Sequence, residues 1–238
     1  MRPVVLCLEQ QRGAPLARLG PLLHGAGLEV RVVEAPGGVD VGGLADCSGV
    51  IVLGGEMGCH DAAQFPWLDD EVELLRSAHE RELPVLGICL GGQLLAAALG
   101  GRVVAGACHE IGWFQSEVVS DDPLLGPAGE RMQFLWHSDA FEPPPRAEVL
   151  VPGRSPPAAP LAFRCGTSYG LQFHPEVTPD LVAAWVADDD HELAELGVDG
   201  AELVATTKRQ EPAYARQAER MAAGFAGLVA DRSHSLEI

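Results

Sequence analysis

A cysteine between two glycines has the sequence context of a nucleophile. Residues 84–99 read PVLGICLGGQLLAAAL, an apolar run followed by G-x-C-x-G and a stretch rich in Leu and Ala. This order of strand, sharp turn and helix is that of a nucleophile elbow. Gly87 and Gly91 leave the turn uncrowded, and the helix after Cys89 would direct N–H groups and its positive end toward the sulfur. Both effects favour the thiolate, although a buried, inert cysteine fits the same pattern.

A histidine and a glutamate follow the end of another apolar run. Residues 169–177 read YGLQFHPEV, which places His174 and Glu176 two apart. Residues two apart in extended chain point to the same side, and a carboxylate beside an imidazole orients the ring and supports its charge. Functional groups gather at the carboxyl ends of strands in a doubly wound sheet, so Cys89 and His174 are expected to meet. We therefore predict a Cys–His–Glu triad, the alternative being a strand-end histidine with a surface acid.

A third predicted strand ends in two consecutive glycines, Gly54 and Gly55. Residues 51–58 read IVLGGEMG, and glycines allow a ligand to approach main-chain N–H groups closely. The N–H of Gly55 and that of Leu90, the residue after the nucleophile, form a candidate oxyanion hole. A tight turn explains the same glycines, and no phosphate-loop motif is present because G-K-[ST] is missing.

Other polar residues give weaker alternatives. Cys59-His60-Asp61 is a possible ligand set, but adjacent residues rarely converge on one ion and the chain has no CxxC pair, so no metal and no cofactor are predicted. His137 is a rival base, because Asp139 follows it at the same spacing as Glu176 follows His174.

The elements that must position these residues alternate between apolar strands and helices. We expect strands at 4–8, 28–33, 49–53 and 84–88, and helices near 16–23, 67–83 and 91–99. This rhythm predicts the α/β class, with a doubly wound, mostly parallel, flavodoxin-like central sheet and helices on both faces. Short strand-like pieces from 102 to 173 predict an antiparallel or mixed extension of that sheet. Proline-rich stretches at 141–146 and 151–160 are typical of surface loops.

The last part of the sequence is helical. Thr178 followed by Pro179 and an acid is a good helix start, and Tyr214, Ala218, Met221, Phe225 and Leu228 form one apolar stripe. We expect a domain over residues 1–190 and a helical extension over 191–238 that packs on the same domain; a subunit contact is the alternative use of the stripe.

Composition excludes several classes of function. The 238 residues carry 16 Lys and Arg against 34 Asp and Glu, a formal net charge of −18, which disfavours nucleic acid and anionic membrane surfaces as partners. The sequence has no run of about 18 apolar residues, so we predict no membrane helix. With no apolar leader, we expect a cytoplasmic protein whose six cysteines are reduced.

Together the segments LGGEMG, GICLGGQLLA and LQFHPEV resemble the class I, triad-type glutamine amidotransferases. HEIGW at 109–113 and WHSD at 136–139 are similar to the free-standing branch close to the amidotransferase domain of GMP synthase. The resemblance implies that Cys89 attacks the side-chain amide of glutamine, that His174 transfers the proton and that Glu176 holds His174. It also implies that Gly55 and Leu90 stabilise the oxyanion.

By the same resemblance, Gln93 would hold the amino-acid end of the substrate. A thioester on Cys89 would then be hydrolysed to glutamate, with ammonia passed to a synthase on a separate chain. Two alternatives stay open: a self-contained γ-glutamyl hydrolase acting on γ-glutamyl amides, and a non-catalytic regulatory subunit on the same fold.

Overall fold

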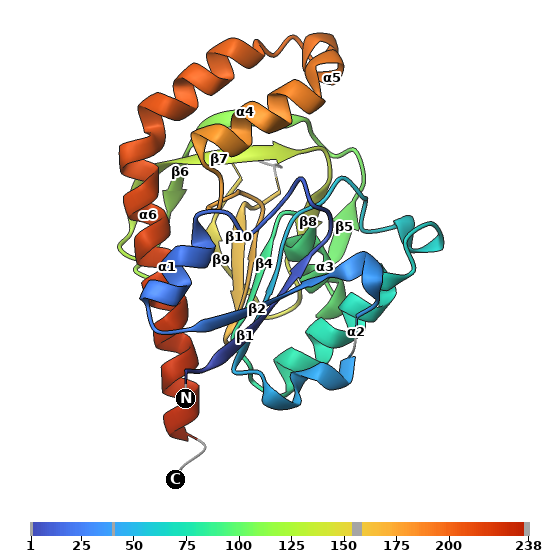
Figure 1. Ribbon diagram of the computed structural model, residues 1–238, viewed down its shortest axis with the longest axis vertical. Coiled ribbons are helices and arrows are strands. Elements are labelled where there is room, and N and C mark those ends of the chain that lie inside the picture. The colour runs from blue at the N-terminus through green and yellow to red at the C-terminus, as the bar shows by residue number, and fades with distance from the viewer. Residues whose placement is uncertain (1, 40, 154–158, 236–238) are drawn as a thin grey trace.

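A seven-stranded sheet forms the centre of the computed structural model, which describes residues 2–39, 41–153 and 159–235 (Figure 1). Its strand order is β2-β1-β3-β4-β11-β10-β9. The first five strands in this order run parallel, and β10 and β9 add to the edge in antiparallel fashion. The strands are β1 Val4–Glu9, β2 Glu29–Glu34, β3 Gly49–Val52, β4 Val85–Ile88, β9 Glu148–Val151, β10 Ala162–Cys165 and β11 Ser168–Leu171.

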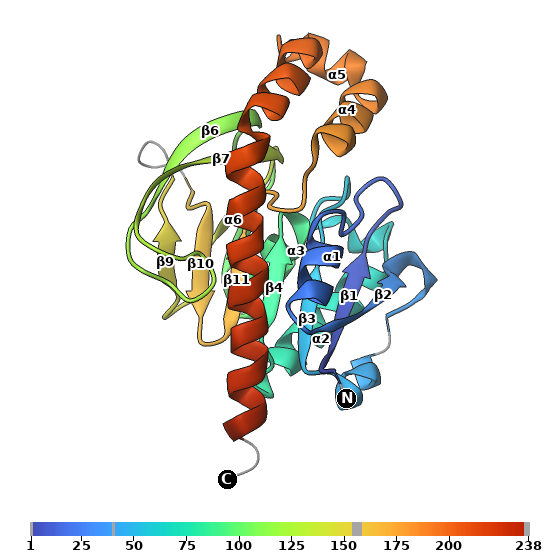
Figure 2. The same cartoon turned by 60° about the vertical axis from the view of Figure 1, so that its left-hand side comes forward.

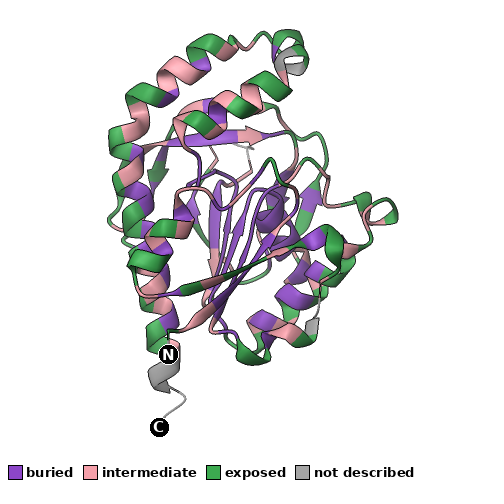
Figure 3. Cartoon of the chain, in the orientation of Figure 1, coloured by how far each residue is buried: buried purple, intermediate pink, exposed green. Residues whose placement is uncertain are grey.

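Side-chain alternation divides the core between the two faces of the sheet. Val5 and Cys7 of β1 pack on one face with helix α1 (Leu19–Gly25), whereas Leu6 and Leu8 pack on the other face with α2 (Trp67–Glu80) and α3 (Leu90–Ala98). Figure 3 shows the central strands buried between these layers. The predicted doubly wound α/β fold, with helices on both faces, is confirmed.

The predicted sheet extension is wrong in part. β9, β10 and β11 do join the central sheet, but the other short strands form two separate two-stranded sheets. β6 (Glu110–Val118) pairs only with β7 (Gly129–His137) among the described residues, and β5 (Arg102–Val104) pairs with β8 (Ala140–Glu142). The first predicted proline-rich loop thus begins inside β8, and residues 154–158 of the second lie outside the described residues.

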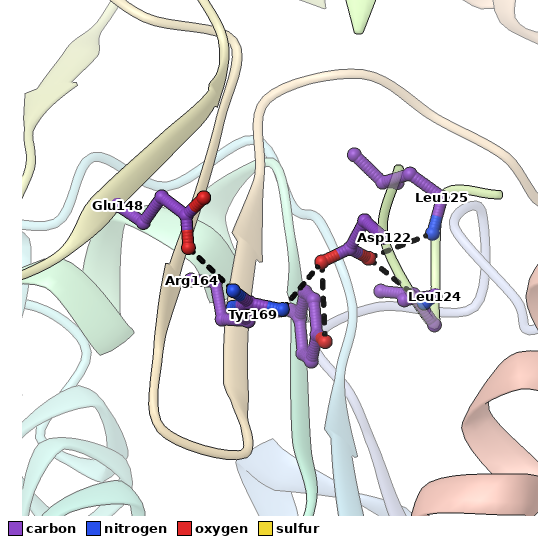
Figure 4. Close-up of polar contacts among 6 residues, drawn as sticks. All are labelled: Asp122, Leu124, Leu125, Glu148, Arg164 and Tyr169. Carbon is purple, nitrogen blue, oxygen red and sulfur yellow. Dashed lines mark hydrogen bonds and ion pairs between the residues drawn. The ribbon is translucent and has the colours of Figure 1, made fainter. Parts of the chain in front are cut away.

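A polar network around the buried Asp122 joins the β6–β7 connection to the edge of the central sheet (Figure 4). The carboxylate of Asp122 accepts hydrogen bonds from the N–H groups of Leu124 and Leu125 and pairs with the Arg164 guanidinium at 2.9 Å. Arg164 also pairs with Glu148, and the Tyr169 hydroxyl lies 3.5 Å from Asp122. Burying a carboxylate is costly unless it is paired and hydrogen-bonded. The partners of Asp122 link the loop between β6 and β7 to β9, β10 and β11.

Three helices follow β11, and the last one runs along the sheet. α4 (Pro179–Asp188) begins as predicted, since the Thr178 hydroxyl accepts from the N–H of Leu181. After α5 (Asp190–Glu195), α6 (Gly200–Ser235) crosses the face that α1 also covers (Figure 2). Among the described residues, no helix combines the length and apolar character that a membrane span requires.

The apolar stripe of α6 packs against the central sheet from Ala218 onward, whereas Tyr214 belongs to the cluster around Phe134 of β7. Tyr214, Ala218, Met221 and Phe225 are each at most 3% exposed, and Leu228 is partly buried. Gly224 allows α6 to approach the chain closely, because a Cβ there would lie 2.2 Å from the Pro123 carbonyl oxygen. The domain limits at 190 and 191 stay a prediction, and residues 236–238 lie outside the described residues.

A carboxyl group is buried on the core face of α2. Glu71 is 0% exposed, and the Gln10 side-chain amide donates to its two oxygens at 2.8 and 2.6 Å. Gln10 in turn accepts from the Trp67 indole N–H. Burial raises the pKa of Glu71 to about 8, against a smaller lowering by Gln10, because the charged form is poorly solvated there.

Glu71 is expected to make stability depend on pH. Its folded-state pKa of about 8 lies above the ordinary value of 4.5, so the folded state holds a proton that the unfolded chain releases between these pH values. The free energy of unfolding should therefore fall as pH rises from about 4.5 to about 8. Glu71→Gln has no carboxyl group to titrate, so it should lose this pH dependence. The free energy of unfolding of the variant, measured with urea, should therefore rise relative to that of wild type as pH increases. Glu73→Gln, at an exposed position of the same helix, is the control, and an equal response of both variants would contradict the assignment.

A substitution of Phe225 would test whether α6 and the rest of the chain unfold together. Phe225→Ala should lower the free energy of unfolding by about 3–5 kcal/mol, because it leaves a cavity in the core shared with the sheet. One thermal transition, followed by circular dichroism, should move to lower temperature as a whole. Glu219→Ala on the exposed side of α6 should leave it nearly unchanged. A separate early melting of α6 would show that the helix is independent.

Candidate active site

Cys89 lies on a strained turn between β4 and α3. Its φ of 52° and ψ of −110° are rare for a residue with a side chain. The glycines on either side are required sterically: a Cβ on Gly87 would lie 2.3 Å from the Gly91 carbonyl oxygen, and one on Gly91 would lie 2.1 Å from the Val52 carbonyl oxygen. The predicted sharp turn with close backbone contacts is therefore present. It is possible because Gly87 and Gly91 have no Cβ atom.

His174 and Glu176 follow β11 and form a buried pair. The Nδ1 atom of His174 lies 2.6 Å from Oε1 of Glu176, and the two side chains are 6% and 3% exposed. The backbone around the histidine is fixed by two hydrogen bonds: its N–H donates to the Phe134 carbonyl, and its carbonyl accepts from the Tyr214 hydroxyl at 2.9 Å. Strand β7 and helix α6 thus fix the backbone that carries the imidazole.

The structure brings Cys89 next to the His174–Glu176 pair. Gly54, after β3, lies between them: a Cβ there would be 3.2 Å from His174 Cε1 and 3.4 Å from the Cys89 Cβ. The Nε2 atom of His174 is buried and has no hydrogen-bond partner among the described residues. This nitrogen is available to exchange a proton with the thiol or with a bound substrate.

Charge in this group favours an ion pair of thiolate and imidazolium. Burial alone would raise the pKa of the Cys89 thiol, but the charge of His174 and contact with its ring outweigh burial, and the pKa is lowered. For His174, burial opposes the charged form, whereas Glu176 and Cys89 raise its pKa well above the ordinary value. Gln172, 1% exposed, adds a donor 3.7 Å from the Cys89 sulfur.

A cavity of about 560 Å³ opens above these residues. The predicted oxyanion residues Gly55 and Leu90 line it, as does Gln93, so all the predicted site residues except Glu176 lie on its wall. Gly55 packs tightly, since a Cβ there would be 2.8 Å from the Gln10 Cβ. Gln93 is 3% exposed and its amide donates to the Asp139 carbonyl at 3.2 Å.

His137 also lines the cavity and has other partners. Its Nδ1 donates to the Asp139 backbone carbonyl at 2.9 Å, not to that residue's carboxylate, so the pair does not repeat the His174–Glu176 geometry. Burial acts to lower the pKa of His137, but Cys108 and Glu110 raise it to about 10, with a contribution from Cys89. Its charge adds to the stabilisation of the Cys89 thiolate.

Several residues at the site were not predicted from the sequence. Trp185 of α4 stands with its ring edge against His174, with centroids 5.2 Å apart. Tyr214 and Gln172 carry an ordinary helix or strand pattern, so nothing in their local sequence marks them. The weak metal candidate Cys59-His60-Asp61 does not converge in the described chain: His60 bonds the Val103 carbonyl and Asp61 accepts from the Gly58 N–H.

Solved structures of similar fold share the architecture. A glutamine amidotransferase from Thermotoga maritima matches with a TM-score of 0.86 and 29% identity, covering 95% of this chain and 99% of that one. A glutamine amidotransferase from Methylobacillus flagellatus matches with a TM-score of 0.82 and 27% identity, over 96% of this chain and 95% of the other.

Sequence comparison finds similar proteins of greater length. The glutamine-hydrolyzing GMP synthase of Marinobacter nauticus is 39% identical over 112 residues, which are 43% of this chain and 21% of that protein. The chain thus spans only about a fifth of this curated relative. The family model for class-I glutamine amidotransferases matches residues 23–189, most of the sequence. By this match, and by the amidotransferase structures that its fold follows, the chain belongs to the class-I glutamine amidotransferases, a family of amide-hydrolysing enzymes.

Proposed function

We propose that this protein hydrolyses the side-chain amide of glutamine through a thioester on Cys89, giving glutamate and ammonia for an acceptor synthase on a separate chain. The observation that carries the proposal is the Cys89 thiol of lowered pKa on a strained turn, beside the buried His174–Glu176 pair. An amide is a poor electrophile, and a thiolate with a positioned acid divides its hydrolysis into two easier steps.

In the first step the Cys89 sulfur attacks the amide carbon and the C–N bond breaks. His174 gives its Nε2 proton to the departing nitrogen, which leaves as ammonia. In the second step His174 takes a proton from water, the hydroxyl adds to the thioester carbon, and the C–S bond breaks to release glutamate. Glu176 keeps His174 oriented throughout and favours its charged form.

Negative charge develops on the carbonyl oxygen in both steps. The N–H groups of Gly55 and Leu90 are proposed to stabilise it, since both residues line the cavity and Leu90 begins α3, where N–H groups have no partner within the helix. Gln93, on the same wall, is proposed to hold the amino-acid end of glutamine. The named activity of the GMP synthase relatives, glutamine hydrolysis, supports glutamine as the substrate.

A self-contained γ-glutamyl hydrolase is the second candidate. The cavity of about 560 Å³ favours it, because this volume lies in the range of pockets that bury ligands larger than one amino acid. The same triad would cut the γ-glutamyl amide bond with no partner protein. A non-catalytic regulatory subunit would not need the buried, charged triad geometry.

Glutamate release tests the proposed function directly. The purified chain should release glutamate from glutamine, and Cys89→Ala should reduce kcat/KM by at least about 10³-fold with the fold intact by circular dichroism. Cys165→Ala, at a half-exposed cysteine on β10 outside the cavity, should be fully active. Equal activity of Cys89→Ala and wild type would overturn the mechanism. Fast, Cys89-dependent release from a γ-glutamyl conjugate but not from glutamine would favour the hydrolase.

The division of roles between His174 and Glu176 has its own test. His174→Ala should lower kcat by about 10²–10⁴-fold, because it removes the proton donor, and Glu176→Gln should cost less. Without the Glu176 charge the pKa of His174 falls, so the proton on His174 is lost at lower pH. The alkaline limb of the activity profile of Glu176→Gln should therefore move to lower pH. A loss in Glu176→Gln equal to that of His174→Ala would contradict an orienting role.

A further inference from the structure

The pairing of β6 with β7 gathers three potential metal ligands at one end of that sheet. Glu110, the first residue of β6, is the register partner of His137, the last residue of β7. Cys108 stands two residues before Glu110, and its N–H donates to the Ser138 carbonyl at 3.0 Å, which continues the pairing. Residues two apart in extended chain face the same side. As a result, one donor atom from each of these residues lies within 4.8 Å of the other two.

His137 is oriented as metal-binding histidines are. A carbonyl oxygen only accepts, so the 2.9 Å contact with the Asp139 carbonyl requires the proton on Nδ1 and leaves the Nε2 lone pair free in the neutral ring. The side chain is 3% exposed. Nε2 lies 3.3 Å from Oε2 of Glu110 without hydrogen-bond alignment to any described residue. Fixing one ring nitrogen on a backbone carbonyl is the usual way a protein aims the other at a metal.

We propose that Cys108, Glu110 and His137 bind one zinc ion through Sγ, a carboxylate oxygen and Nε2. One sulfur, one nitrogen and one oxygen donor suit Zn²⁺, with water in the fourth tetrahedral position. The thiolate and the carboxylate carry two negative charges, which the ion neutralises in a half-buried place. Binding forms S–Zn and N–Zn bonds as the thiol proton and the Nε2 proton of the charged His137 ring leave to solvent, so no oxidant or reductant is involved.

The dimensions require the Cys108 side chain to turn, because its sulfur lies 3.8 Å from Nδ1 of His137, whereas the zinc would bind Nε2. With bonds of about 2.0–2.3 Å in a tetrahedron, zinc ligands lie roughly 3.3–3.7 Å from one another. The 3.3 Å between His137 and Glu110 already meets this value. Cys108 and Glu110 are both partly exposed, so their side chains have room to turn and the ion has a route from solvent.

The site is separate from the catalytic thiol but connected to the cavity wall. The Asp139 carbonyl that accepts from His137 also accepts from the Gln93 side chain. The Asp139 carboxylate accepts from the Gly106 N–H, which fixes the same loop to the segment before β6. Zinc on His137 would therefore stabilise the position of Asp139, and through it that of Gln93, which is proposed to contact the substrate. Its role is structural, and it does not depend on the glutamine reaction.

Metal titration in a background without the catalytic thiol tests the proposal. Cys89→Ala protein is titrated with Zn²⁺ by calorimetry and with Co²⁺ by absorption. One equivalent of each should bind, and Co²⁺ should show tetrahedral bands with a thiolate charge-transfer band. Adding Cys108→Ser should abolish the charge-transfer band and weaken zinc binding by at least about 10-fold, as loss of a ligand demands. Adding Cys165→Ser, at another half-exposed cysteine, should change neither.

The variants separate loss of a ligand from loss of the fold. Cys108→Ser is nearly isosteric at a partly exposed position, so its circular dichroism spectrum should match that of the background protein. Zn²⁺ should raise the melting temperature of Cys89→Ala protein but not that of the double variant. Zinc affinity unchanged by Cys108→Ser, a Co²⁺ spectrum without a thiolate band, or binding that requires Cys89 would each overturn the proposal. None of these outcomes depends on whether glutamine is the substrate.

Discussion

The close contact of backbones around Cys89 is the constraint on which the site depends. The backbone of the turn between β4 and α3 is so close to its neighbours that Gly87, Gly91 and Gly92 have no space for a Cβ. A Cβ on any of these glycines would lie 2.1–2.6 Å from a backbone carbonyl oxygen. This packing fixes the unfavourable φ of Cys89, because relaxing the turn would separate α3 from β3 and β11. The sulfur is thereby raised at the strand ends, where His174 and the glycines after β3 already lie.

Much of this arrangement follows from local sequence. The glycine spacing around Cys89 predicts the turn, and the two-residue spacing of His174 and Glu176 predicts a facing pair, which the structure places at 2.6 Å. Both signals are local, since they depend on what a strand end and a sharp turn require. The sequence could not separate His137 from His174 as base, because Asp139 and Glu176 share one spacing. The structure distinguishes them at Nδ1: this atom of His137 donates to a backbone carbonyl, whereas that of His174 pairs with a carboxylate.

What local sequence did not predict depends on pairing between distant segments. β6 and β7 look like further sheet strands, yet they pair with each other, and only that register places Cys108 and Glu110 beside His137. Glu71 looks like a solvated residue of a charged helix, but it lies on the buried face, where Gln10 from the end of β1 meets it. In both cases the informative fact is the partner, and the partner is far away in sequence.

A single hydroxyl group couples the position of α6 to the position of the His174 backbone. Tyr214 donates to the His174 carbonyl, and its helix is 36 residues long, about 54 Å at roughly 1.5 Å per residue. Pro212 lies inside α6 and interrupts its hydrogen bonding just before Tyr214, so a slide or tilt of the segment that begins at Tyr214 must either carry the His174 backbone with it or break this hydrogen bond. A molecule that binds the exposed side of α6 far from the cavity would therefore be able to shift the His174 backbone without entering the cavity.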